Sequence, residues 1–205
     1  MHAADNFCFR RIIDYLIKAM RFIDKIKDFS LLDYYLAVFF VISAAALRFI
    51  PHWPNFAPIA AMALFGGVYL NKKYALAVPI LAMLISDYFI GFYDIKTMAS
   101  VYLSFILVGL IGLYLKNHKS FINVIGGAFL GSVLFFIITN FAVWYFYNWY
   151  PHTLSGLSQC FVLATPFFKN TLAGDFFYVG VMFGAYELAA FWVKSRYFAI
   201  KESAL

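Results

Sequence analysis

Long hydrophobic runs alternate with short polar breaks along most of this chain, and the breaks divide it into six apolar segments. The predicted membrane spans are residues 31–50, 58–70, 74–93, 98–115, 121–147 and 171–193. A helix needs about 20 residues to cross a hydrocarbon core of about 30 Å, so the short second segment must either start below the membrane surface or include residues of the turn before it. An apolar piece at 160–168, interrupted by Pro166, is expected to precede the sixth span as a separate element. The pattern predicts an all-α, polytopic membrane protein with a six-helix transmembrane bundle over residues 31–205.

The first 30 residues follow a different pattern. Between residues 7 and 29, charged side chains such as Arg10, Asp14 and Lys18 recur at helical spacing, and apolar side chains such as Ile13 occupy the opposite stripe. Residues 1–30 are therefore expected to form an amphipathic helix on the cytoplasmic surface of the lipid bilayer. Docking of this helix to a partner protein is the alternative.

The polar break between the first two spans is rich in proline. It reads Arg48-Phe49-Ile50-Pro51-His52-Trp53-Pro54-Asn55-Phe56-Ala57-Pro58. Proline fixes its own backbone angle and disfavours helix in the residue before it, so a stiff turn of fixed shape is predicted. Such a turn is tolerated at membrane depth only where protein surrounds it. We interpret it as one wall of a binding site, with a linker that only reverses the chain as the alternative.

Composition and charge agree with a membrane protein and orient it. The chain is 64% apolar and 13% charged, whereas soluble domains are roughly 45–50% apolar and about 25% charged. Thirteen Lys and Arg residues fall on one side of the predicted topology and three, Arg48, Lys96 and Lys169, on the other. By the positive-inside rule both termini are expected in the cytoplasm, and the proline-rich turn faces outward. The basic residues thus serve as topology signals, and no nucleic-acid binding is expected.

The sequence shows no pattern of known catalytic or cofactor chemistry. Its His and Cys spacings fit no zinc site, and it has no phosphate-binding glycine loop and no serine elbow. Cys8 and Cys160 fall on opposite sides of the predicted topology, so no disulfide is expected. We predict a protein that is not an enzyme and that carries no metal and no cofactor.

Scarce polar residues from several spans and loops converge on one depth, at about 1.5 Å per helical residue. The candidate substrate-binding residues are Arg48, His52, Asn55, Asp87, Tyr93, Asn140, Trp144, Tyr147, Lys169, Asn170 and Asp175. Ionisable groups inside a membrane usually face a cavity or one another. Two interpretations stay open and can coexist. One is a water-filled ligand pocket open to the outside, and the other is a buried ion network of Arg48, Asp87 and Asp175, with Arg48 and Asp87 as a structural pair.

Small residues at a spacing of four mark close helix contacts. Gly127 with Gly131 and Gly180 with Gly184 have this spacing. Most such pairs are expected to pack within the bundle, and some to meet another membrane protein.

Four motifs carry a family resemblance. Besides the turn at 48–58, they are Ile85-Ser86-Asp87, Ile138-Thr139-Asn140-Phe141 and Pro166-Phe167-Phe168-Lys169-Asn170-Thr171-Leu172-Ala173-Gly174-Asp175. Over residues 35–192 the chain resembles an uncharacterised family of six-helix bacterial membrane proteins. That family is similar to the substrate-binding S components of energy-coupling-factor (ECF) vitamin transporters. The resemblance implies a bundle in the bacterial cytoplasmic membrane that holds a vitamin or its precursor and works beside a transmembrane coupling subunit and its ATPases.

The sequence therefore predicts an uptake protein that captures a small ring-bearing solute at the outer face. Aromatic side chains would stack on the ring, and the polar layer would fix its polar edge. A proton-coupled secondary carrier is one alternative, although its carboxylates are expected near the midplane. A non-catalytic structural membrane subunit is the other.

Overall fold

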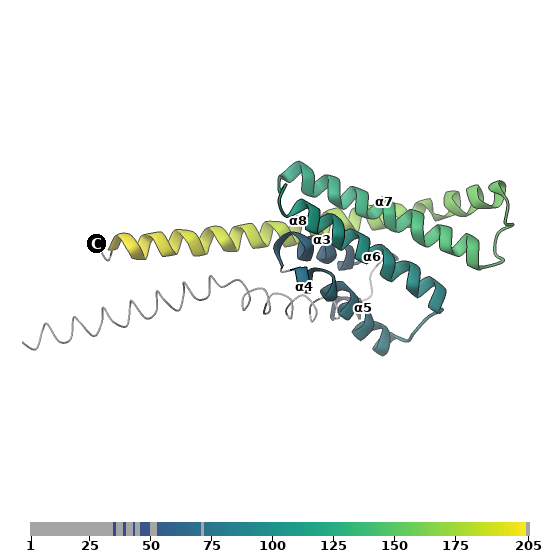
Figure 1. Ribbon diagram of the computed structural model, residues 1–205, viewed down its shortest axis with the longest axis horizontal. Coiled ribbons are helices and arrows are strands. Elements are labelled where there is room, and N and C mark those ends of the chain that lie inside the picture. The colour runs from purple at the N-terminus through teal and green to yellow at the C-terminus, as the bar shows by residue number, and fades with distance from the viewer. Residues whose placement is uncertain are drawn as a thin grey trace, which may run out of the picture.

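The computed structural model describes residues 35, 39, 43, 46–49, 53–70 and 72–203, which form a bundle of α-helices (Figure 1). The helices are α3 (Ile59–Tyr69), α4 (Lys72–Ala75), α5 (Ala77–Ile90), α6 (Ile95–Leu115), α7 (Phe121–Phe146) and α8 (Leu154–Ser203). Residues 46–48, near the end of the predicted first span, are also helical. Most of that span and the predicted surface helix of residues 1–30 lie outside the described residues.

Among the residues that the structure describes, three segments are long and apolar enough to cross a membrane, namely Lys72–Ile90, Ile95–Leu115 and Phe121–Phe146. They correspond to the third, fourth and fifth predicted spans, and they identify a multi-pass membrane protein. Helix α3 is apolar but has only 11 residues, so it is short, as the sequence indicated. The total of six spans stays a prediction.

The chain after the α7–α8 loop differs from the prediction. We expected a polar loop to residue 158, a break at Pro166 and a separate sixth span at 171–193, but α8 is one continuous helix of 50 residues with Pro166 inside it. A proline removes one backbone hydrogen bond, and membrane helices tolerate this loss where neighbouring groups compensate. At about 1.5 Å per residue α8 is roughly 75 Å long. Its C-terminal part therefore extends well beyond the other helices (Figure 1).

Helix α3 forms the core of the bundle. Its sequence is apolar on every side, which is typical of a helix buried all round, and residues 59–68 are all buried. It contacts α5, α6, α7 and α8. The contact with α6 joins the two backbones directly, because a Cβ added to Gly67 would lie 2.5 Å from the Gly109 carbonyl oxygen. A Cβ on Gly112 would overlap the carbonyl oxygen of Leu64.

The two predicted glycine pairs have different surroundings. Gly127 and Gly131 of α7 pack against Leu115 and Val108 of α6, which confirms their role as a helix contact. A Cβ added to Gly180 or Gly184 of α8 would meet nothing within 4 Å. These two glycines therefore leave an open face on α8 rather than a contact within the described bundle.

The two ends of the bundle differ in their polar residues. One end carries the turn at residues 53–58, the α5–α6 loop at 91–94 and the α7–α8 loop at 147–153. The other end carries four lysines near the α3–α4 and α6–α7 connections, which are Lys72, Lys73, Lys116 and Lys119. These lysines are among the residues from which the sidedness was predicted, and the orientation itself stays a prediction.

Candidate substrate-binding site

The turn at residues 53–56 is a tight turn fixed on α8. The Phe56 amide donates to the Trp53 carbonyl (3.0 Å), and Asn55 has a φ of 63°. Proline followed by a residue with positive φ is the pattern of a type II turn, and Asn tolerates this left-handed conformation. The Phe56 ring lies 5.4 Å from the ring of Tyr178. Gly174 permits this approach, because a Cβ there would lie 3.1 Å from the Phe56 Cα.

A cavity of about 380 Å³ lies between this turn and helices α3, α5, α6, α7 and α8. Its lining residues are Arg48, Asn55, Ala57, Ile59, Ala60, Met83, Ile90, Tyr93, Val101, Phe105, Phe135, Thr171 and Asp175. The volume falls within the range of small-molecule sites, which are about 300–1,000 Å³ and mostly apolar with a few polar groups. Four of the predicted site residues, Arg48, Asn55, Tyr93 and Asp175, thus meet around one cavity.

One wall of the cavity is aromatic. The rings of Phe105 on α6 and Phe135 on α7 stack with centroids 5.5 Å apart and an interplanar angle of 24°. Phe105 is buried, and Phe135 is partly buried. The wall offers an apolar surface against which a planar group could pack.

Asp87 is the centre of a closed polar cluster beside the cavity. Its side chain is fully buried, and Arg48 Nη1 donates to its Oδ1 at 2.7 Å. Tyr102 of α6 donates its hydroxyl to Oδ2 at 2.8 Å. The same Arg48 nitrogen also donates to Ser86 Oγ and, at 3.4 Å, to the Met83 carbonyl. The predicted Arg48–Asp87 pair is confirmed, and both carboxylate oxygens of Asp87 have protein partners.

Asp175 of α8 is buried differently. Its exposure is 3%, and Ser132 of α7 donates to its Oδ2 at 2.6 Å. Within the described residues no cation pairs with it, so the predicted three-residue ion network is wrong for Asp175. Arg48 pairs with the fully buried Asp87 instead.

Tyr93 lines the cavity from the α5–α6 loop. Burial raises its pKa to about 12, the negative charge of Asp87 acts in the same direction, and Arg48 opposes the shift. The phenol therefore stays protonated at neutral pH. It can donate or accept a hydrogen bond, but it adds no charge to the cavity.

Five other predicted residues lie away from this cavity. Asn140 Nδ2 donates to the Phe136 carbonyl of its own helix (2.8 Å). Trp144 Nε1 donates to the Pro151 carbonyl (3.0 Å). Tyr147 donates to the Asp94 carboxylate, and its hydroxyl lies 2.7 Å from Thr97 Oγ1. These contacts hold the α7–α8 loop and the start of α6.

The remaining two are on α8, where Lys169 is exposed and Asn170 is partly buried, and neither lines the cavity. His52 falls outside the described residues.

Sequence reasoning missed several residues of the site. Tyr102 and Ser132 are the hydroxyl partners of Asp87 and Asp175, and Thr171 lines the cavity. All three lie within apolar helices, where single hydroxyl groups are common and give little signal on their own. Within the described chain, no group of three or more His, Cys, Asp or Glu side chains could hold a metal ion.

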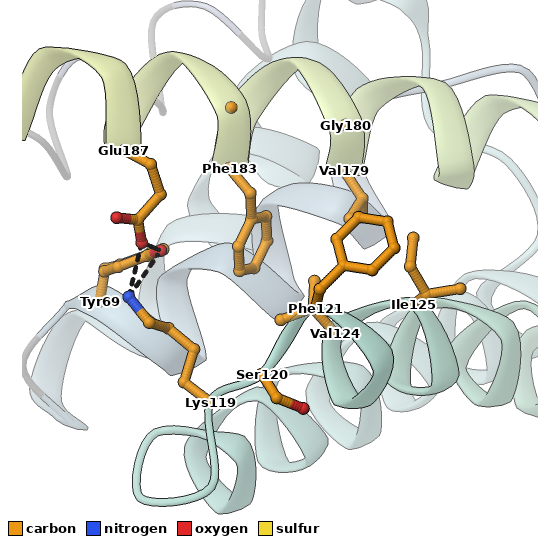
Figure 2. Close-up of a pocket in the computed structure, with 11 residues that line it drawn as sticks. Tyr69, Lys119, Ser120, Phe121, Val124, Ile125, Val179, Gly180, Phe183 and Glu187 are labelled. Atoms are coloured by element: carbon orange, nitrogen blue, oxygen red, sulfur yellow. Dashed lines mark hydrogen bonds and ion pairs between the residues drawn. The ribbon is translucent and has the colours of Figure 1, made fainter.

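A second cavity, of about 370 Å³, opens between α7 and α8 at the lysine-rich end (Figure 2). Lys119 forms an ion pair with Glu187 (2.5 Å), and Tyr69 donates its hydroxyl to the same carboxylate. Apart from Ser120, the rest of this cavity is apolar, with Phe121 and Phe183 in its wall (Figure 2). No predicted site residue lies here. The exposed ion pair is expected to contribute little stability.

Residues 30–200 match the sequence profile of DUF6580, a family of unknown function. No match was found among curated proteins or among solved structures.

Proposed function

The chain belongs to the family of unknown function DUF6580, and we propose that it is a substrate-binding membrane protein that captures a small ring-bearing solute for import. In this proposal it sits in the bacterial cytoplasmic membrane with both termini in the cytoplasm, as an ECF S component does. A vitamin or vitamin precursor is the expected class of solute. A transmembrane coupling subunit with its ATPases would complete the transporter.

The observation that carries the proposal is the cavity beside the proline-rich turn. It combines an aromatic wall with polar groups from the residue 46–48 segment, the turn, the α5–α6 loop and α8. A site made only for packing would be filled by side chains, whereas this one retains about 380 Å³ of space. A buried pocket with a few convergent polar groups is the usual form of a small-molecule site.

Sidedness supports capture from outside. The four lysines at the far end would remain in the cytoplasm under the positive-inside rule. The cavity, at the opposite end, would then open outward. Import rather than export is the direction that this placement favours.

Asp175 supports a second candidate, a proton-coupled carrier. A buried carboxylate with no cation among the described residues is a group that such carriers protonate and deprotonate during transport. A carrier would lose uptake when the proton gradient is collapsed. An S-component-like protein would retain solute binding after purification.

Mass spectrometry of small molecules that co-purify with the protein tests the proposal. We expect a ring-bearing solute with the wild type, and its loss in Phe135→Ala, which removes half of the aromatic wall. The matched control is Phe129→Ala, on the same helix but 50% exposed and outside the cavity. Absence of any solute from the wild type, or equal recovery from both variants, would contradict the proposal.

A further inference from the structure

One acidic side chain that lines the cavity beside the proline-rich turn has no cation partner among the described residues. Arg48 and Asp87 neutralise each other at 2.7 Å. Asn55 and Thr171 are neutral, and the raised pKa of Tyr93 keeps its phenol uncharged. Asp175 is then the one acidic side chain among the described lining residues, and no cation pairs with it there.

One oxygen of Asp175 is available to a ligand. Oδ2 accepts from Ser132, and no described residue donates to Oδ1. Among the described residues, every fully buried side-chain N or O atom has a hydrogen-bond partner. Because Oδ1 lacks a partner, it is not fully buried and must be accessible to solvent. Asp175 lines the cavity, so the cavity is where a ligand could reach this oxygen.

The protein surroundings on the other side of Asp175 are apolar. A small adjoining void that holds no water-sized space is lined by Ala60, Leu64, Val108 and other small or aliphatic residues from α3, α6, α7 and α8. These side chains can form neither an ion pair nor a hydrogen bond with a carboxylate. A buried carboxylate left without a cation is costly, so a positive donor in the cavity would offset this cost.

We propose that the solute carries a positively charged nitrogen that donates to Asp175, while its ring packs on the Phe105–Phe135 wall. The substrate class is therefore a monocationic ring compound, for example a heteroaromatic ring with an ammonium group. This inference rests on the proposed function and names the class of solute. Arg48 contributes no selectivity for anions, because Asp87 neutralises its charge.

Three ring compounds of similar size and different charge provide the test. They are tryptamine (cationic at neutral pH), tryptophol (neutral) and indole-3-acetate (anionic), each titrated calorimetrically into the full-length protein in detergent. We expect tryptamine to bind about tenfold or more tightly than tryptophol, because a charge-assisted hydrogen bond is lost with the neutral probe. Indole-3-acetate should bind most weakly.

Asp175→Asn should remove the preference for tryptamine over tryptophol and leave the affinity for tryptophol nearly unchanged. The matched control is Asp94→Asn, which removes a carboxylate outside the cavity and should retain the preference. Equal affinities for the three probes in the wild type would overturn the inference even if Asp175→Asn failed to fold. A preference that persists in Asp175→Asn would also overturn it.

The same experiment separates this inference from the proposed function. Binding of tryptophol that depends on Phe135, without any preference for tryptamine, would support the ring-binding site. It would reject the inference that the solute is positively charged. Failure of all three probes, together with no co-purifying solute, would reject the site itself.

Discussion

The two sides of the cavity beside the proline-rich turn are built in opposite ways. On the α3–α5–α6 side, Asp87 has two protein partners, and glycines bring the α3 and α6 backbones into contact. On the α7–α8 side, Asp175 has one partner among the described residues, and further along α8 a Cβ added to Gly180 would meet nothing within 4 Å. On the first side, Arg48 and Asp87 are engaged with protein partners that hold the bundle together. On the second side, Asp175 Oδ1 remains available to a ligand.

The largest expected effect comes from removing the Arg48 cation on the α3–α5–α6 side of the cavity. Arg48→Met would leave Asp87 buried without its partner, at a cost of about 3–5 kcal/mol in the free energy of unfolding. For a chain of this size that corresponds to a melting temperature lower by roughly 6–20 °C. Differential scanning fluorimetry in detergent would measure it.

The double variant Arg48→Met with Asp87→Leu is the control, because it removes both charges and should recover part of the loss. A single Arg48→Met variant that melts like the wild type would show that the buried Asp87 does not depend on Arg48 for stability.

The two carboxylates should respond differently to the same substitution. Asp87→Asn leaves the Arg48 cation buried and should lower stability by about 3 kcal/mol. Asp175→Asn strands no described cation, so its stability should change by less than about 1 kcal/mol. Thermal melting and ligand affinity should be measured on the same preparations. Equal destabilisation by the two variants would remove the contrast between the two sides.

Glycine substitutions compare backbone packing on the two sides. Gly112→Ala forces a Cβ against the α3 backbone and should cost about 1–3 kcal/mol. Gly180→Ala meets nothing within 4 Å and should be neutral or stabilising by up to about 1 kcal/mol, because Ala favours helix over Gly. Chemical or thermal unfolding of the two variants decides this. A strong destabilisation by Gly180→Ala would mean that α8 packs closely there.

The smallest effect concerns the loop that connects the two sides. The hydrogen bond from Tyr147 is the main reason that the pKa of Asp94 lies below its ordinary value of 3.8. A lowered folded-state pKa stabilises the protein above that ordinary value, and the contribution is lost as the pH falls through the folded-state pKa.

Tyr147→Phe should therefore lower the melting temperature slightly at pH 7, and the difference should shrink when the pH falls well below 3.8. A difference that does not depend on pH would indicate that ring packing, not the Asp94 carboxylate, carries the effect.

The sequence predicted those features that depend on charged residues being rare in apolar helices, on local turn preference or on the length of an apolar run. A buried Arg and Asp in apolar spans have few partners available, so the Arg48–Asp87 pair could be anticipated. Pro54 followed by Asn55 specifies a turn locally, and the turn is present. Apolar length identified the spans that became α5, α6 and α7.

Other features depended on neighbours that the sequence does not specify. Helical spacing places Asn140, Trp144 and Tyr147 on a shared face, but it does not say what that face contacts. Each of the three instead bonds to backbone or loop groups nearby. Pro166 suggested a break because local propensity favours one, whereas α8 continues through it.

The sequence could not distinguish two carboxylates of similar depth, because their partners come from other segments. Arg48 and Tyr102 of α6 contact Asp87. Ser132 of α7 contacts Asp175.

Helix α3 has a consequence for how the protein is made. Its 11 residues cover only about 16 Å, too little for the translocation machinery to retain it in lipid as an independent span. Because residues 59–68 are buried against other helices, we expect α3 to pack into the bundle only when its neighbours are in the bilayer. The cavity wall that begins at Ile59 would then be completed late in folding, and a newly inserted chain should lack the finished cavity until that step.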